Sequence, residues 1–259
     1  MSHNHGTAYT IWFSGAVCLV CSIFVCLSAV MLKDRQEVNR QLDKQKNVLL
    51  AAGLARGDEE LSNADVQQRF ASIRPVVVEL KIGRELPDVD ASTFDMRGAQ
   101  ADEATSSRAP DNPAKVLRVP HNGIVYQVME GGRTVKLVLP VSGKGLWSTL
   151  HGFLAIDADT TTVKGVSFYE HSETPGLGGE VENPNWTAGW VGRRLFDDNW
   201  LPVFQVKKGT AGSAAEDPHH VDGLSGATLT CKGVTALVNF WIGENGYGPY
   251  LKNFREGGK

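Results

Sequence analysis

The sequence predicts an α+β protein in which a single N-terminal transmembrane helix precedes one soluble domain with an antiparallel sheet and flanking helices. Three observations support this fold class. Residues 11–32 contain no charged side chain. From about residue 116 onward, segments alternate apolar and polar residues between glycine turns, as antiparallel hairpins do. Segments with helical spacing of apolar residues flank these strands.

Residues 11–32 are long enough to cross a bilayer. As a helix they would measure about 33 Å, against a hydrocarbon core of about 30 Å. They exceed the apolar core of a signal peptide, no Lys or Arg precedes them, and no clear A-x-A cleavage site follows. We therefore expect a retained single-pass anchor, with residues 1–10 as an N-terminal tail.

Positive charge is distributed unequally on the two sides of the expected anchor. Two histidines precede it, whereas five basic residues follow it: Lys33, Arg35, Arg40, Lys44 and Lys46. Because Lys and Arg favour the cytoplasmic side of a membrane, this count alone places the C-terminal part in the cytoplasm. Acidic residues between these bases weaken the count, so it leaves the orientation open.

The cysteines exclude a disulfide framework in the soluble part, because three of the four lie in the anchor and only Cys231 lies beyond it. Cys18 and Cys21 have the C-x-x-C spacing of some redox and metal sites. Inside an apolar helix we interpret them as small apolar side chains.

Residues 33–80 are expected to form a helical neck and the first strand of the soluble part. Charged residues followed by an apolar run predict a helix over 33–55, which glycines break at its end. A second short helix is expected over 63–70 and a strand over 76–80.

Residues 81–259 are expected to form the folded domain. The stretch from about 97 to 115 is rich in Ala, Ser, Asp and Pro, which predicts a mobile surface loop. Alternation predicts two hairpins, the first joining 123–128 to 134–139 and the second joining 153–156 to 163–169. Helical spacing is found at 186–196 and 232–242, and a short strand at 203–206.

Several common chemistries are not supported. The 26 Lys and Arg against 29 Asp and Glu give a formal charge of −3, whereas nucleic-acid binding needs a basic surface. Residues 142–145 lack the first glycine of a P-loop, and Val181 stands where a dinucleotide fingerprint needs its third glycine. The histidines show no ligand spacing, so we expect no metal site. We also expect no catalytic acid, base or nucleophile.

The clearest chemical signal is the segment DGLSGATLT at 222–230. Gly223 and Gly226 allow tight turns, Ser225 is an N-cap candidate, and Ala227 leaves the backbone uncrowded.

A helix after this segment would direct its free amides and positive dipole end toward Thr228 and Thr230. A phosphate or phosphodiester on a hydroxyl there would be favoured. A simple helix cap explains the same residues, so the residues alone leave both interpretations open.

The SGAT at 225–228, preceded by Asp222 and followed by Thr230, resembles the flavinylation motif of the FMN-binding domain family. The resemblance implies that an FMN transferase moves FMN from FAD onto the hydroxyl of Thr228 and leaves a phosphoester. Thr230 is the second choice of acceptor. The motif residues expected at the cofactor are Asp222, Ser225, Gly226, Ala227, Thr228 and Thr230.

Further segments resemble the C subunits of sodium-translocating NADH:quinone reductases: 44–53, 145–148 (GLWS), 152–155, 173–178 (ETPGLG) and 246–250 (GYGPY). This resemblance implies a loop at 173–178 whose backbone lies against the isoalloxazine ring. Trp147 is expected either beside the flavin or in the core, and Trp186 and Trp190 in packing. The additional cofactor residues are Trp147, Glu173, Thr174, Gly176, Leu177 and Gly178.

The resemblance implies one role in a membrane complex that oxidises NADH, reduces ubiquinone and moves sodium outward. The chain would relay electrons through its FMN, from a membrane-embedded iron centre to the FMN of the B subunit, without an NADH or quinone site of its own. Its partners would be the A, B, D, E and F subunits, together with the FMN transferase. The resemblance also implies a bacterial inner membrane with the domain in the periplasm, against the charge count.

Two alternatives stay open. The G subunit of an Rnf-type electron-transfer complex shares the anchor and the acceptor motif, although the segments 145–148 and 173–178 and the long neck favour the C subunits. From a different class, the chain could be a flavin-free membrane-anchored scaffold in which residues 222–230 only cap a helix.

Overall fold

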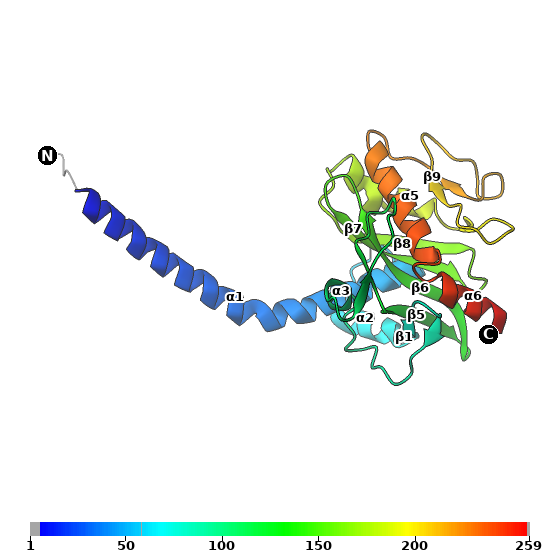
Figure 1. The fold of residues 1–259 in the computed structure, drawn as a ribbon, viewed down its shortest axis with the longest axis horizontal. Helices are drawn as coiled ribbons and strands as arrows, with labels where there is room; N and C mark the ends of the chain where they lie inside the picture. Colours follow the sequence, from blue (N-terminus) through cyan, green and yellow to red (C-terminus); the bar gives the residue numbers. More distant parts are fainter. Residues whose placement is uncertain (1–5, 58, 258–259) are drawn as a thin grey trace. The chain divides into compact units, whose positions relative to one another are not determined.

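The computed structural model describes residues 6–57 and 59–257, which divide between two compact units, Met1–Lys44 and Gln45–Lys259 (Figure 1). In the first unit, the helical segment Thr7–Lys33 is long and apolar enough to cross a membrane, and its most apolar window is not buried in the protein. Its length and composition are consistent with the anchor expected at 11–32.

Helix α1 (Thr7–Ala52) includes residues of both units. It ends where Gly53 takes a left-handed φ of +70°, a conformation that glycine adopts without strain. Its last turns are buried, with Val48 and Leu49 fully inaccessible to solvent. The second compact unit, Gln45–Lys259, thus includes part of the segment 33–80 that is expected from the sequence to form the neck and the first strand.

Helix α2 (Asn63–Phe70) matches the helix predicted over 63–70. Ser62 and Asp65 form a reciprocal capping box at its start, which satisfies two backbone amides that would otherwise lack partners.

A six-stranded antiparallel sheet forms the centre of the domain, in the order β2-β1-β5-β6-β7-β8. Its strands are β1 (Ile73–Glu79), β2 (Arg84–Glu85), β5 (Asn122–Glu130), β6 (Arg133–Lys144), β7 (Thr149–Asp157) and β8 (Val163–Glu170). Both predicted hairpins are confirmed, as β5–β6 and β7–β8. Gly131 and Gly132 both have positive φ in the first turn, as a tight two-residue hairpin connection requires.

The two faces of the sheet are covered by different helices. Lys136 of β6 donates to the carbonyl of Ala52 at the end of α1, at 2.8 Å. Gly143 of the same strand lies against Leu237 of α5 (Thr228–Ile242). Because residues 136 and 143 have opposite parity, α1 and α5 pack on opposite faces. Helix α6 (Gly248–Gly257) follows α5 and completes the chain that the structure describes (Figure 1).

The stretch at 97–115 is not the irregular loop that its composition predicts. It carries most of α3 (Met96–Ala101) and strand β3 (Ser106–Arg108), which pairs with β4 (Arg118–Pro120). The side chain of Asp95 caps α3 by accepting from the amide of Arg97. Polar residues thus act here as caps and not only as solvated loop positions.

The helix predicted over 186–196 is also wrong in extent. Only α4 (Pro184–Ala188) is helical, and it follows the 3-10 turn η1 (Gly178–Glu182). Gly189 ends α4, and Gly192 then takes a φ of +84°. The apolar spacing reflects packing instead: Trp190 is fully buried, with its ring 4.5 Å from that of Phe204.

The strand predicted at 203–206 is shorter than expected. It is reduced to β9 (Gln205–Val206), which pairs in parallel with β10 (His220–Val221) in a small separate sheet.

Candidate functional site

Thr228 is the first residue of α5, and its side chain is exposed. The preceding N-cap position is Ala227, and no side chain caps the helix. The prediction that Ser225 caps α5 is wrong, because a turn from Leu224 to Ala227, with Gly226 at a φ of +70°, leaves Ser225 outside the helix. The first-turn amides of α5 therefore have no side-chain oxygen as a cap.

Thr230 lies in the same helical turn but in a different environment. Its side chain is 1% exposed, and its hydroxyl donates to Oε2 of Glu173 at 2.6 Å. Of the two threonines in this segment, Thr228 is thus exposed and Thr230 is buried.

Glu173 is buried and is surrounded by donors. Beyond Thr230, the backbone amides of Leu146, Trp147 and Ser148 donate to its carboxylate, at 3.2, 2.9 and 3.3 Å. Burial by itself would raise the pKa of this carboxyl. The hydrogen bonds from Thr230 and from the three amides outweigh burial and hold the pKa below its ordinary value. Glu173 is therefore a carboxylate at neutral pH.

The loop at 173–178 lies directly beside α5 and the turn before it. A Cβ atom at Gly178 would lie 2.6 Å from Oγ1 of Thr230, and one at Gly226 would lie 2.8 Å from Cδ2 of Leu177. Thr174 closes the loop by accepting from the amides of Leu177 and Gly179. The structure thus brings together two segments that are about 50 residues apart in the sequence.

Large apolar side chains are exposed on the segments that meet here. Trp147 is 65% exposed, Leu229 is 55% exposed, and Leu146 and Leu177 are also exposed. Trp147 therefore does not fill the core. Exposed aromatic and aliphatic surface beside a hydroxyl at a helix N-terminus fits a ligand with a flat apolar ring and a phosphate.

Asp222 has structural contacts in the segment before the turn. Its carboxylate accepts from the amide of Ala211 at 2.6 Å, and its carbonyl accepts from the indole of Trp186 at 2.7 Å. The next residue, Gly223, packs so closely on the carbonyl of Lys207 that a Cβ would lie 2.3 Å from it. These contacts fix the path of the chain toward α5. A part for Asp222 in cofactor binding stays a prediction.

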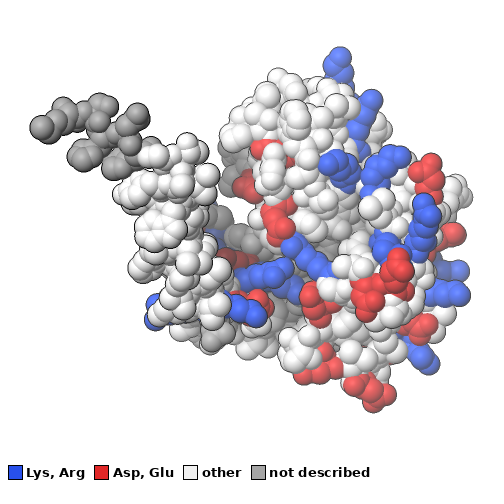
Figure 2. All heavy atoms as spheres, turned by 60° about the vertical axis from the view of Figure 1, so that its left-hand side comes forward, with Lys and Arg blue, Asp and Glu red and all other residues white. Residues whose placement is uncertain are grey.

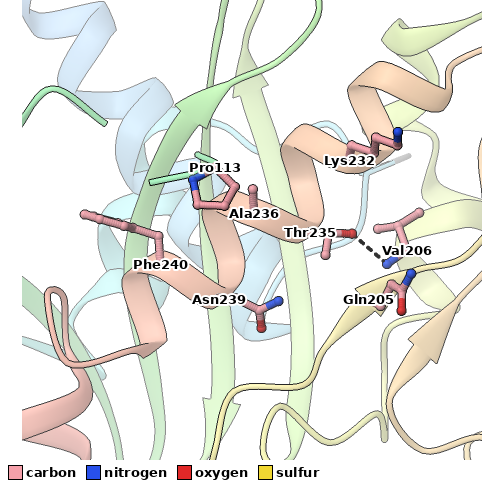
Figure 3. Close-up of a pocket in the computed structure, with 8 residues that line it drawn as sticks. All are labelled: Pro113, Gln205, Val206, Lys232, Thr235, Ala236, Asn239 and Phe240. Atoms are coloured by element: carbon pink, nitrogen blue, oxygen red, sulfur yellow. Dashed lines mark hydrogen bonds between the residues drawn. The ribbon is translucent and has the colours of Figure 1, made fainter. Parts of the chain in front are cut away.

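A pocket of about 530 Å³ lies elsewhere on α5 (Figure 3). It is lined by Pro113, Gln205, Val206, Lys232, Thr235, Ala236, Asn239 and Phe240. Because none of the residues predicted at the cofactor lines it, this pocket is separate from the candidate site.

Charged residues of both signs are interspersed on the face of the domain drawn in Figure 2. Among the residues that the structure describes, no group of three or more His, Cys, Asp or Glu side chains could hold a metal ion.

Comparisons with known proteins show the family to which the chain belongs. Residues 145–243 match the family model described as the FMN-binding domain. The C subunit of the Na(+)-translocating NADH-quinone reductase of Vibrio anguillarum is 44% identical over 99% of this chain and 98% of its own length. The corresponding C subunit of Yersinia pestis is 46% identical over 98% of this chain and 96% of its own length. The chain belongs to this family of C subunits, NqrC.

A solved NqrC structure has the same fold. The crystal structure of Shewanella oneidensis NqrC superposes with a TM-score of 0.77 at 34% identity, over 84% of this chain and 99% of that one. The FMN-binding match includes every residue predicted at the cofactor, from Trp147 to Thr230. Membership of the NqrC family confirms the resemblance found in the sequence and the predicted α+β fold.

Two residues beside the site were not among those predicted. Leu146 and Leu229 are exposed apolar residues next to Trp147 and Thr228. An apolar residue directly after Thr228, in the first turn of a helix, is the signal that could have identified Leu229.

Proposed function

We propose that this chain is the electron-relay subunit of a sodium-pumping NADH:ubiquinone reductase, and that its FMN is linked by a phosphoester to Thr228. The FMN transferase would supply the group from FAD: the threonine oxygen forms the new bond to phosphorus, the diphosphate bond of FAD breaks, and AMP leaves. The product is a phosphothreonine diester.

The contrast between the two threonine hydroxyls is the observation that supports this acceptor. A transferase needs an accessible hydroxyl, and Thr228 is exposed at the start of α5. The hydroxyl of Thr230 is buried and donates its proton to Glu173. Modification of Thr230 would break that hydrogen bond and force a charged phosphate into a buried position, which is strongly unfavourable.

The residues around Thr228 fit FMN. The uncapped first turn of α5 favours a phosphate through its amides and dipole. The exposed side chains of Trp147 and Leu177 offer apolar surface for the ring. When bound, FMN supplies one-electron redox chemistry. The chain itself attaches the phosphate end, covers the ring and excludes water from part of it.

The NADH and quinone sites belong, in this proposal, to other members of the complex. The A, B, D, E and F subunits would be the partners, with an iron centre as electron donor and the FMN of the B subunit as acceptor. The apolar part of α1 anchors the chain in the bacterial inner membrane, and the domain lies in the periplasm.

In-gel flavin fluorescence after denaturation tests the proposal. The chain is produced with the FMN transferase as wild type, Thr228→Ala and Thr230→Ala. We expect fluorescence in the wild type and none in Thr228→Ala. A wild type without fluorescence would support the flavin-free scaffold instead.

A further inference from the structure

We infer that Glu173 is a positioning residue whose buried carboxylate joins the 145–148 loop to the first turn of α5, and so sets the orientation of Trp147 relative to Thr228. The part of this inference that concerns the flavin rests on the proposed function. The part that concerns the two protein segments does not.

The carboxylate uses both oxygens for this connection. Oε1 accepts from the amides of Trp147 and Ser148, and Oε2 accepts from the amide of Leu146 and the hydroxyl of Thr230. A carboxylate has about four acceptor positions, so these four donors occupy its capacity. Glu173 therefore acts on a ligand through its neighbours and not by direct contact.

The glycines on either side allow the backbone to close around this carboxylate. A Cβ at Gly145 would lie 2.6 Å from Oε1 of Glu173, and a Cβ at Gly178 would lie 2.8 Å from Oε2. The joined segments are distant in sequence, since the bond to Trp147 spans 26 residues and the bond to Thr230 spans 57. Without the carboxylate, the three backbone amides of residues 146–148 would lose their acceptor and could form hydrogen bonds only to water.

The negative charge is needed as well as the shape. Glu173→Gln has similar volume, but its NH₂ group would replace one acceptor oxygen with donors. At the Oε1 position this group would face the amides of Trp147 and Ser148, and both hydrogen bonds would be lost. At the Oε2 position it would face the amide of Leu146, whose bond would be lost, while the hydroxyl of Thr230 could turn to accept from it. The backbone of Trp147 is held by the bond from its amide to Glu173 and by the bond from Lys144 Nζ to its carbonyl. Its side chain is exposed and depends on this loop for its position.

Asp159 provides a matched control. Its carboxylate also accepts from two backbone amides, of Thr161 and Thr162, and from the hydroxyl of Thr162. It lies in the β7–β8 connection, whereas the 145–148 loop is at the opposite end of β7. Asp159→Asn thus disrupts a similar cluster away from the site.

The experiment uses the full-length chain, produced with the FMN transferase, as wild type, Glu173→Gln and Asp159→Asn. Two properties are measured: hydrogen exchange of the amides at 146–148, and visible circular dichroism of the bound flavin. We expect Glu173→Gln to exchange these amides about tenfold faster or more, as loss of a charge-assisted hydrogen bond implies, and to alter the flavin dichroism. Asp159→Asn should retain both properties of the wild type. Wild-type exchange and dichroism in Glu173→Gln, or equal changes in both variants, would overturn the inference.

A milder pair of variants covers the case in which Glu173→Gln does not fold. Thr230→Val removes one donor and keeps the shape, whereas Thr230→Ser keeps the hydroxyl. We expect faster exchange at 146–148 in Thr230→Val and restored protection in Thr230→Ser; equal exchange in the two would contradict the inference. If the wild type carries no flavin, the proposed function fails, while hydrogen exchange still tests the positioning role.

Discussion

The hydroxyl of Thr230 donates to the carboxylate of Glu173 at 2.6 Å, while Thr228, two residues earlier in the same helix, is exposed to solvent. Two residues along an α-helix correspond to a rotation of about 200°, so the two side chains point in opposite directions. The T-x-T spacing therefore provides one hydroxyl that is bonded inside the fold and one that is exposed to solvent.

The left-handed turn before α5 is expected to tolerate only glycine. Gly226→Ala would place a methyl group at a φ of +70° and 2.8 Å from Cδ2 of Leu177. We expect a loss of about 1–2 kcal/mol in the free energy of unfolding from backbone strain, together with reduced flavinylation because Leu177 is displaced.

Gly131→Ala is the control for this variant. Gly131 has a φ of +57° in the β5–β6 turn, and a Cβ there would meet no atom within 4 Å. Urea unfolding should show a similar loss of stability, with flavin fluorescence at the wild-type level. Equal loss of flavin in both variants would mean that strain alone, and not the contact with Leu177, affects the acceptor.

The stability of the fold should depend on the ionisation of Glu173. Its pKa is lower in the folded state than in the unfolded chain, so its stabilising contribution is present above about pH 4.3 and is lost as the pH falls through the lower folded-state pKa. Urea unfolding of the wild type and Glu173→Gln should therefore differ at pH 7 and converge in acid. A difference that is independent of pH would contradict this account.

The exposed Trp147 and the buried Trp190 should respond differently to truncation. Trp190 is fully buried, and Trp190→Ala should lower the free energy of unfolding by about 3–5 kcal/mol. Trp147 is 65% exposed, so Trp147→Ala should change the free energy of unfolding by about 0.5 kcal/mol or less. Trp147→Ala should therefore retain the stability of the fold and still alter the visible circular dichroism of the flavin, whereas Trp190→Ala should destabilise the fold. An unchanged spectrum would remove Trp147 from the cofactor site.

The orientation of the domain can be tested with reporter enzymes fused after residue 259. Proximal basic residues favour a cytoplasmic domain, whereas the NqrC resemblance favours the periplasm. We expect activity from a reporter that functions only in the periplasm. Activity confined to a cytoplasmic reporter would overturn the proposed location.

Local sequence patterns predicted the regular elements well. Alternation located both hairpins, and the helix expected over 63–70 is α2. These local patterns failed where tertiary contacts determine the backbone conformation. The spacing of Trp186 and Trp190 suggested a helix, but these residues form a ring cluster with Phe168 around the glycine-interrupted segment.

The site was predicted mainly through its resemblance to a flavinylation motif, because a helix cap explains the same residues. Thr228 and Thr230 carry the same hydroxyl group, so residue type alone could not show which of them is exposed. The partner of Thr230 is Glu173, 57 residues away, and nothing in the local pattern indicates that these side chains meet. Likewise, the role of Ser225 as a cap was wrong because the left-handed turn at Gly226 moves the start of the helix to Thr228.

The most direct test of the central claim is to locate the flavin in the chain. Wild-type protein produced with the FMN transferase is digested, and the fluorescent peptide is sequenced by tandem mass spectrometry. Our account predicts one flavinylated peptide with the FMN phosphate on Thr228. FMN on Thr230, or on a residue outside 225–230, would contradict it.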